Sequence, residues 1–423
     1  MSLPYGYELG KNRQFSVIGK NHSLSSTAKQ ARLMTVIPPQ AKRIAQNYKT
    51  ETEVMKKVAV AAILCGASHL ALAQSSVELY GIVDTGFEYV SNVGVADKGL
   101  FRATQLTGQQ PSRWGFKGAE DLGGGLKAIF RLENGFSITN GQLNQGGRLF
   151  GRSAYVGLSS NQWGTLTFGR QQEMLWTALL QADNIGSASY SMVDFDPFLA
   201  SAREDNSVAY TNTVGGFTLG ATYSLGRDTL APGNCAGQQP GDGVACRAWS
   251  AMLQYNSASW GASVAYDEQR GGGTSSVALI PSQPTIAFKS SSDKDSRFLT
   301  DAFAKFGDLR LGAGWIYRRL RADAVSLQTN LFFAGATYPV TPSVVLDGQY
   351  VGLRSTVAGV RGDLAIARVT YLLSKRSSVY VAGAHMFNGH AATFSVSSTS
   401  PVPAAPVAGR GQTGVMVGLR QLF

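Results

Sequence analysis

Cys235 and Cys246 are the residues whose type and spacing most readily support a chemical bond in this chain. Both lie in residues 231–249, a stretch rich in glycine and proline. In an oxidising compartment such as the periplasm, a pair of this kind closes a small disulfide loop. A metal site is the weaker interpretation, because no histidine or second cysteine pair lies nearby. The sequence thus predicts a loop disulfide and neither a metal nor another cofactor.

Histidine chemistry is scarce. After residue 73 the histidines are His385 and His390, both close to the end of the chain. Hydrolases of the serine or aspartate type need a histidine beside the activated residue. No motif places such a serine next to either histidine, so we expect no enzymatic activity and no catalytic residues. A hydrolysis assay with the purified protein tests this alternative.

Residues 55–73 have the features of an export signal. Two lysines precede a short apolar run, and Ala71 and Ala73 supply the small residues that signal peptidase reads. The run is too short to cross a membrane comfortably, and Leu64 before Cys65 does not fit a lipidation motif. We therefore predict a signal peptide, with cleavage before Gln74. Residues 1–54 are polar and unpatterned, and we interpret them as an upstream extension, arising from a start codon placed too early or from an extended signal sequence.

Composition favours a membrane barrel over a soluble domain. Charged residues make up 15 % of the chain, against roughly 25 % in soluble proteins, and 49 glycines are available for turns. The net charge of +11 is concentrated before residue 58, and the rest of the chain has 28 basic and 24 acidic residues. Nucleic-acid-binding proteins show a concentrated basic stripe. No such stripe is present, so we exclude nucleic acid as a partner.

Alternation of apolar and polar residues recurs in short stretches, as expected for membrane strands. It is clearest in residues 126–133, 164–169, 309–317 and 343–350. Short connections, 120–125, 339–342 and 374–378, alternate with long polar ones, 171–203, 227–248, 267–297 and 388–412. About 350 residues at roughly 22 per strand and connection give about 16 strands, enough to enclose an aqueous channel. We predict an all-β, antiparallel transmembrane barrel over residues 74–423.

Several segments, taken together and in order, resemble the general porins of β-proteobacteria. They include SSVELYGIVDTGFEYV, SRWGFKGAEDLGGGLKAIFRLENGF, GRSAYVGLSSNQWGTLTFGRQ, AREDNSVAYTN, YLLSKRSSVYVAG and VGLRQLF. The resemblance implies a trimeric, sixteen-stranded barrel in the outer membrane. The last segment reads as a strand that closes the barrel. Its terminal Phe423 is also expected to act as the signal that the barrel-assembly machinery recognises.

The same resemblance implies where the pore narrows. The third long loop, 171–203, is expected to fold into the lumen, and it carries four acids: Glu173, Asp183, Asp194 and Asp196. Opposite this loop the family places basic residues on the wall, and the matching positions here are Arg113, Arg152 and Arg203, with Lys117 on the inward face beside Arg113. Alternation supports Arg113, because Trp114 and Phe116 suit lipid. It is ambiguous for Arg152, which shares its parity with Val156 and Leu158.

The resemblance therefore implies a water-filled channel for passive diffusion of small hydrophilic solutes and ions. A surplus of arginine at the narrowest point favours anions. The main alternative is a channel specific for one solute, such as phosphate or an organic acid. Another is a surface whose long loops bind receptors or phages in addition to forming a pore. Expected partners are two further copies of the chain, outer-membrane lipid and lipopolysaccharide, and the barrel-assembly machinery.

Overall fold

The computed structural model describes residues 75–104, 108–227, 235–237, 240–278, 280, 285–323, 325–397 and 404–423. The upstream extension 1–54, the signal peptide 55–73 and its cleavage site lie outside the described residues. No helix in the described part of the chain is both long and apolar enough to cross a membrane.

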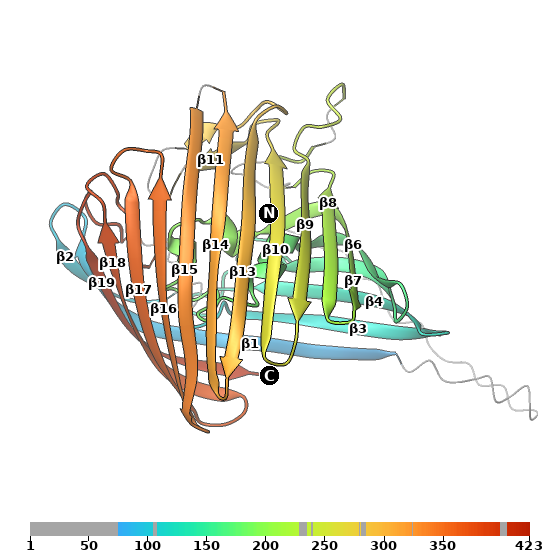
Figure 1. Cartoon of the computed structure of the whole chain (residues 1–423), viewed down its shortest axis with the longest axis horizontal. Coiled ribbons are helices and arrows are strands. Elements are labelled where there is room, and N and C mark those ends of the chain that lie inside the picture. The colour runs from blue at the N-terminus through green and yellow to red at the C-terminus, as the bar shows by residue number, and fades with distance from the viewer. Residues whose placement is uncertain are drawn as a thin grey trace, which may run out of the picture. The chain divides into compact units, whose positions relative to one another are not determined.

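One antiparallel sheet forms the wall of the molecule (Figure 1). Its strands are β1 (Ser76–Val93), β2 (Lys98–Ala103), β3 (Arg113–Gly123), β4 (Leu126–Gly135), β5 (Ser153–Ser160), β6 (Gly164–Gln172), β7 (Arg203–Val214), β8 (Phe217–Ser224), β9 (Ala248–Asn256), β10 (Trp260–Arg270), β13 (Lys294–Phe306), β14 (Leu309–Ala322), β15 (Val325–Thr341), β16 (Val344–Ser355), β17 (Arg361–Leu372), β18 (Ser377–Asn388) and β19 (Gln412–Leu422). Two short strands, β11 (Ser276–Ala278) and β12 (Thr285–Ala287), pair separately in a loop.

The sheet closes into a barrel of sixteen positions. Of its seventeen strands, β2 and β3 share one position, because both pair with β1 over different parts of its length. On its other side β1 pairs with β19, and Gly81 and Phe423 exchange backbone hydrogen bonds of 3.0 and 3.1 Å. Closure leaves no free sheet edge, and the predicted strand number and final closing strand are confirmed.

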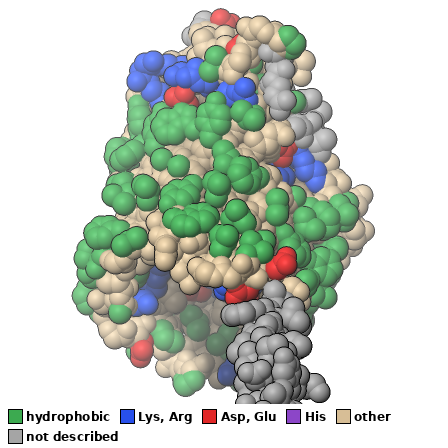
Figure 2. All heavy atoms as spheres, turned by 90° about the vertical axis from the view of Figure 1, so that its right-hand side faces the viewer, with side chains coloured by type: hydrophobic (Ala, Val, Ile, Leu, Met, Phe, Trp, Pro, Cys, Tyr) green, Lys and Arg blue, Asp and Glu red, His purple; other side chains and the backbone are tan. Residues whose placement is uncertain are grey.

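Alternation along the strands separates a wet face from an apolar one. In β13, Phe298 faces outward and is 38 % exposed, whereas the neighbouring Arg297 and Leu299 face inward and are buried. Successive side chains of a strand point to opposite faces, so this pattern places charged residues inside and apolar residues on the outer surface. Figure 2 shows the result on one side of the barrel, where hydrophobic side chains form a broad belt.

Short turns lie at one end of the barrel and long loops at the other. The β3–β4 turn contains Gly123, Gly124 and Gly125, whose φ angles of 85°, 61° and 80° lie in the left-handed region that favours glycine. The expected turns at 339–342 and 374–378 are present with shifted boundaries, because β15 continues to Thr341 and β18 begins at Ser377. The four predicted long loops are confirmed, and residues 136–152 form a fifth.

The third long loop folds into the barrel, as predicted. It carries the helix α2 (Met174–Leu179), the 3-10 helix η1 (Met192–Asp194) and the short helix α3 (Phe198–Ser201), and α2 packs against β8, β9, β10 and β13. Two other segments reach the loop. The break between β2 and β3 contacts it where Ser189 N donates to Gly108 O (3.0 Å). The last loop contacts it where Phe394 packs edge-on against Phe195, with ring centroids 4.9 Å apart.

Candidate functional site

Arg113, Arg152 and Arg203 lie together on the inner wall. The Nε of Arg203 donates to the carbonyl oxygen of Arg152 (3.1 Å), and Arg113 interacts electrostatically with both other guanidiniums. The parity of Arg152 is no longer ambiguous, because β5 begins only at Ser153. Val156 points outward with 59 % exposure, while Arg152 is 9 % exposed.

Three more arginines, which sequence reasoning did not assign to the site, join this group. Arg131 and Arg152 both bind Glu133, at 2.5 and 2.6 Å. Asp205 binds the other two arginines, Arg148 at 3.1 Å and Arg170 at 2.6 Å. We call the six residues the basic cluster: Arg113, Arg131, Arg148, Arg152, Arg170 and Arg203. Four of these guanidiniums contact the two carboxylates, and the six arginines outnumber Glu133 and Asp205 by four.

Arg113 carries a charge that no carboxylate neutralises by direct contact. Its guanidinium donates to the carbonyl oxygen of Pro111 (3.2 Å) and to Oε1 of Gln110 (3.5 Å), and among the described residues it forms no ion pair. Lys117 lies about 13 Å further along β3 than Arg113, at 3.3 Å per residue, and it stands directly opposite Arg131 of the cluster on β4. Its ammonium is half exposed and pairs with Glu78 (3.1 Å).

The four loop acids stabilise the loop itself. Glu173 caps α2 by accepting the backbone N–H groups of Leu175 and Trp176, both at 2.7 Å. Asp194 caps η1 by accepting the N–H of Ser191 (3.3 Å), and Asp183 accepts that of Ile185 (3.1 Å). Glu173 and Asp194 are fully buried, and Asp183 is partly exposed.

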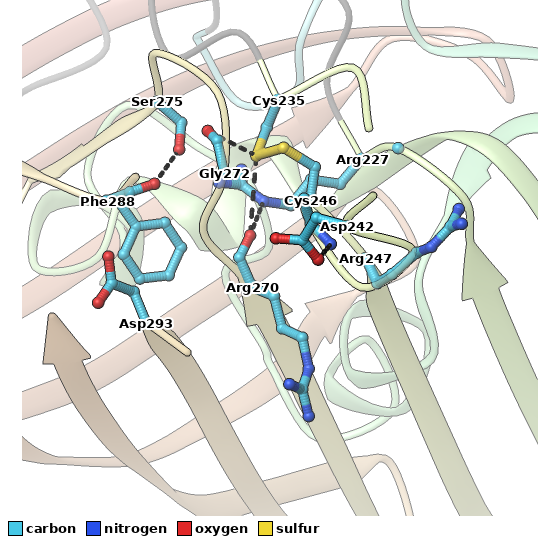
Figure 3. Close-up of a disulfide and its surroundings, with 12 residues drawn as sticks. Arg227, Cys235, Asp242, Cys246, Arg247, Arg270, Gly272, Ser275, Phe288 and Asp293 are labelled. Atoms are coloured by element: carbon cyan, nitrogen blue, oxygen red, sulfur yellow. Dashed lines mark hydrogen bonds between the residues drawn. A yellow bond between two sulfur atoms is a disulfide. The ribbon is translucent and has the colours of Figure 1, made fainter. Parts of the chain in front are cut away.

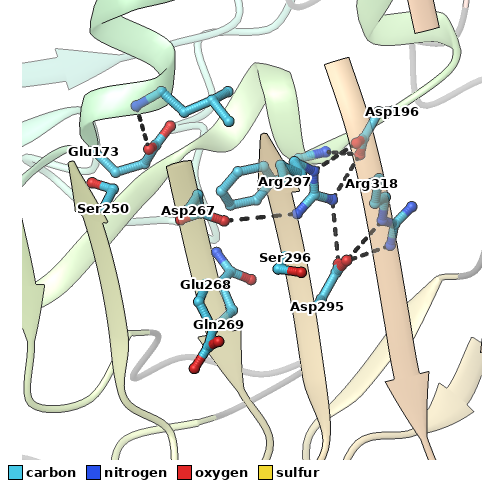
Figure 4. Close-up of polar contacts among 12 residues, drawn as sticks. Glu173, Asp196, Ser250, Asp267, Glu268, Gln269, Asp295, Ser296, Arg297 and Arg318 are labelled. Carbon is cyan, nitrogen blue, oxygen red and sulfur yellow. Dashed lines mark hydrogen bonds and ion pairs between the residues drawn. The ribbon is translucent and has the colours of Figure 1, made fainter. Parts of the chain in front are cut away.

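Asp196, the fourth acid, anchors the loop to the wall through Arg297 of β13. Arg297 donates to both oxygens of Asp196, at 2.8 and 3.1 Å, and also pairs with Asp295 (3.2 Å). Figure 4 shows the guanidinium between these carboxylates, with Asp267 on its other side at 3.9 Å. Burial raises the pKa of Asp196, but Arg297 and Arg318 lower it further, so it lies below its ordinary value.

Further contacts extend the loop along the wall opposite the basic cluster. Asn184 N donates to Oε1 of Gln349 in β16 (3.1 Å), and Arg368 in β17 donates to the carbonyl oxygen of Ile185 (3.4 Å). The loop is therefore seated against β8 through β17, whereas the arginines lie on or beside β3 through β7. This arrangement places the loop and the basic cluster across the lumen from each other.

The cysteines lie away from the constriction, in the loop between β8 and β9. Cys235 and Cys246 form a disulfide with Cα atoms 5.0 Å apart, and both residues are buried. Figure 3 shows the bond beside the neighbouring loop, where the guanidinium of Arg227 lies over the ring of Phe288 at 5.5 Å. In the ranges that the structure describes, no three His, Cys, Asp or Glu side chains gather in a way that could hold a metal ion.

Comparisons with known proteins agree with this geometry. A profile of the Gram-negative porin family matches residues 59–391. An outer membrane porin of Bordetella pertussis is 31 % identical over 373 residues, covering 79 % of this chain and 94 % of that protein. Outer membrane porin protein 32 of Delftia acidovorans is 29 % identical, with 87 % and 100 % coverage.

Solved structures share the fold. A structure described as the anion-selective porin from Comamonas acidovorans matches with a TM-score of 0.68 and 25 % identity, covering 83 % of this chain and 100 % of that chain. The profile match spans most of the sequence. The barrel closes with the sixteen strand positions that the sequence predicts. The chain therefore belongs to the Gram-negative porin family.

Proposed function

We propose that this outer-membrane porin is a diffusion channel that prefers anions, and that the basic cluster is the filter. As a porin, the protein provides a water-filled path for passive diffusion of small hydrophilic solutes and ions. The observation that carries the proposal is the surplus of guanidinium groups on one wall of the lumen, where Arg113 forms no ion pair with any residue in the described part of the chain. A fixed positive field in a narrow passage raises the local concentration of anions.

In this proposal the basic cluster selects ions, whereas the loop acids hold the loop in place. Glu173, Asp194 and Asp196 are buried and already hold backbone N–H groups or Arg297. They therefore hold the loop in place and contribute little opposing charge to the lumen, and Asp183, which is partly exposed, is the acid left to face solutes. The Comamonas porin, described as anion-selective, gives independent support for the preference.

Other parts of the proposal follow from the family and the barrel surface. We propose that three copies assemble in the outer membrane, surrounded by lipid and lipopolysaccharide. Phe423, at the closing pair of strands, is the recognition signal for the barrel-assembly machinery. The chain works without a cofactor and without catalysis. His385 lies on the outward side of β18, where its Nδ1 is 2.7 Å from the Oγ1 of Thr413.

Planar bilayers test the proposal most simply. When a potassium chloride gradient is applied, we expect the reversal potential of the purified porin to lie towards the equilibrium potential of chloride. The conductance should rise in proportion to salt concentration, as for a general diffusion pore. A reversal potential on the cation side would contradict the proposal, and saturation by one solute would identify the solute-specific alternative.

A further inference from the structure

A row of basic side chains crosses the outer surface of the barrel at the loop ends of β10, β13 and β14. The strand register places Arg270 opposite Lys294, and Lys294 opposite Arg321. Arg319 lies two residues before Arg321 and therefore shares its outward face. The intervening Leu320 and the following Ala322 are buried on the inner side. We call Arg270, Lys294, Arg319 and Arg321 the basic row.

Aromatic side chains lie directly below the basic row on the same face. Tyr266 pairs with Phe298, and Phe298 pairs with Tyr317 across the strands. Trp315 lies below Tyr317 and contacts Phe298, with ring centroids 6.1 Å apart. Aromatic girdles mark the depth at which hydrocarbon gives way to lipid head groups. The basic row therefore lies at head-group level. On the side of the barrel in Figure 2, Lys and Arg side chains likewise gather above the hydrophobic belt.

The charges of the basic row are only partly neutralised within the protein. Glu268 pairs with Arg270 (3.1 Å) and Lys294 (3.4 Å). Arg319 and Arg321 form no ion pair with any residue that the structure describes. Arg319 is partly exposed and Arg321 is exposed, so both side chains are accessible from the membrane. The surface is thus complementary to an external group that carries negative oxygen atoms.

We propose that this surface binds the phosphate groups of a phosphorylated glycolipid in the outer leaflet, with its acyl chains lying along the aromatic side chains below. Guanidinium groups match phosphate by two parallel hydrogen bonds. Arg319 and Arg321 are about 7 Å apart along one strand, and cross-strand neighbours are about 5 Å apart. One phosphate can therefore contact several members of the row. The inference rests on the barrel's location in the outer membrane, and it is independent of the ion preference of the pore.

Binding of lipid A to the full barrel in detergent tests this inference, with Arg319→Gln and Arg321→Gln combined. Each basic residue at a membrane surface contributes about fivefold to binding of an anionic lipid, so affinity for bisphosphorylated lipid A should fall about 25-fold. Conductance and reversal potential should not change, because both side chains point away from the lumen. Lipid A stripped of its phosphates should bind the wild-type barrel weakly.

Two control variants separate charge from folding. Arg354→Gln removes an outward arginine that is paired with Asp363 (2.8 Å), and it should leave affinity within about twofold of wild type. Arg319→Lys with Arg321→Lys keeps the charge and should retain most of the binding. The proposal is wrong if the double glutamine variant binds lipid A as tightly as wild type. It is equally wrong if the lysine variant loses as much affinity, or if the dephosphorylated lipid binds as tightly as the intact one.

Discussion

Arg297 is the residue on which the position of the third loop depends most. Its side chain is 1 % exposed, contacts Asp196 and Asp295, and lies under the ring of Phe198 at 4.1 Å. Removing one member of a buried ion-pair network leaves its partners charged and unpaired, at a cost of roughly 3 to 5 kcal/mol. The loop end that carries Asp196 would then be poorly held against β13.

We therefore predict that Arg297→Gln releases the loop without opening the barrel. Single-channel recordings should show larger open-state current noise and more frequent conductance steps than wild type. Arg354→Gln is the matched control, because its exposed pair with Asp363 contributes at most about 1 kcal/mol. Current traces of Arg297→Gln that cannot be told from those of the control would contradict the assignment of Arg297 as the anchor.

Individual site residues were predictable where they stand in a recognisable motif. Arg113 and Arg203 lie in such segments, and the structure brings them together with Arg152. Arg131 alternates with apolar residues in β4, so the sequence predicts that its side chain points inward. The sequence does not predict its contact with Glu133. Arg148 and Arg170 join the cluster through Asp205. That pairing joins residues 35 and 57 positions apart in the chain, which spacing alone does not indicate.

At the scale of elements, the protonation of Glu173 makes the docking of the loop at helix α2 dependent on pH. Burial raises the pKa of Glu173 to about 7, although the N–H groups of Leu175 and Trp176 and the charge of Arg297 lower it. Asp267 of β10 and Glu204 of β7 also act on this carboxyl. The folded pKa exceeds the ordinary value of 4.5. The contribution of Glu173 to loop docking is thus fully present below about pH 4.5, and it is lost as the pH rises through about 7.

We predict that hydrogen exchange of the loop amides, corrected for intrinsic rates, becomes faster relative to the barrel strands between pH 5 and pH 8. Glu173→Gln cannot ionise and should flatten this dependence, while it keeps an oxygen that can cap α2. Asp242 lies in another loop and is partly exposed, so Asp242→Asn is a suitable control. Protection that rises with pH in the wild-type porin would contradict the assignment.

Elements were predictable to the extent that their pattern is local. The strands follow from alternation, and the β3–β4 turn follows from three successive glycines with left-handed φ angles. The break between β2 and β3 does not follow in this way. It is held by Asp84, which accepts the N–H groups of Gln109 (3.0 Å) and Gln110 (2.7 Å). A distant carboxylate that satisfies backbone donors leaves no periodic signal in the sequence.

At the scale of the whole molecule, length and alternation predicted a closed barrel of about sixteen strands because closure is the way a sheet avoids free edges in lipid. The character of the lumen depends on more than closure. The third loop, the break between β2 and β3 and the last loop meet through contacts such as that between Phe195 and Phe394. These contacts form only after the barrel brings distant segments together, so the sequence alone could not predict the narrowing beyond the third loop.

The most direct test of the central claim is the reversal potential of the double variant Arg113→Gln and Arg203→Gln in a potassium chloride gradient. A unit charge about 10 Å from an ion in water contributes roughly 0.4 kcal/mol. Each such charge attracts chloride and repels potassium by that amount, so loss of two should lower the chloride-to-potassium permeability ratio about 16-fold. Arg354→Gln, which removes an exposed charge on the outer face of the barrel, should change the ratio less. A double variant with the same reversal potential as wild type would show that the basic cluster is not the filter.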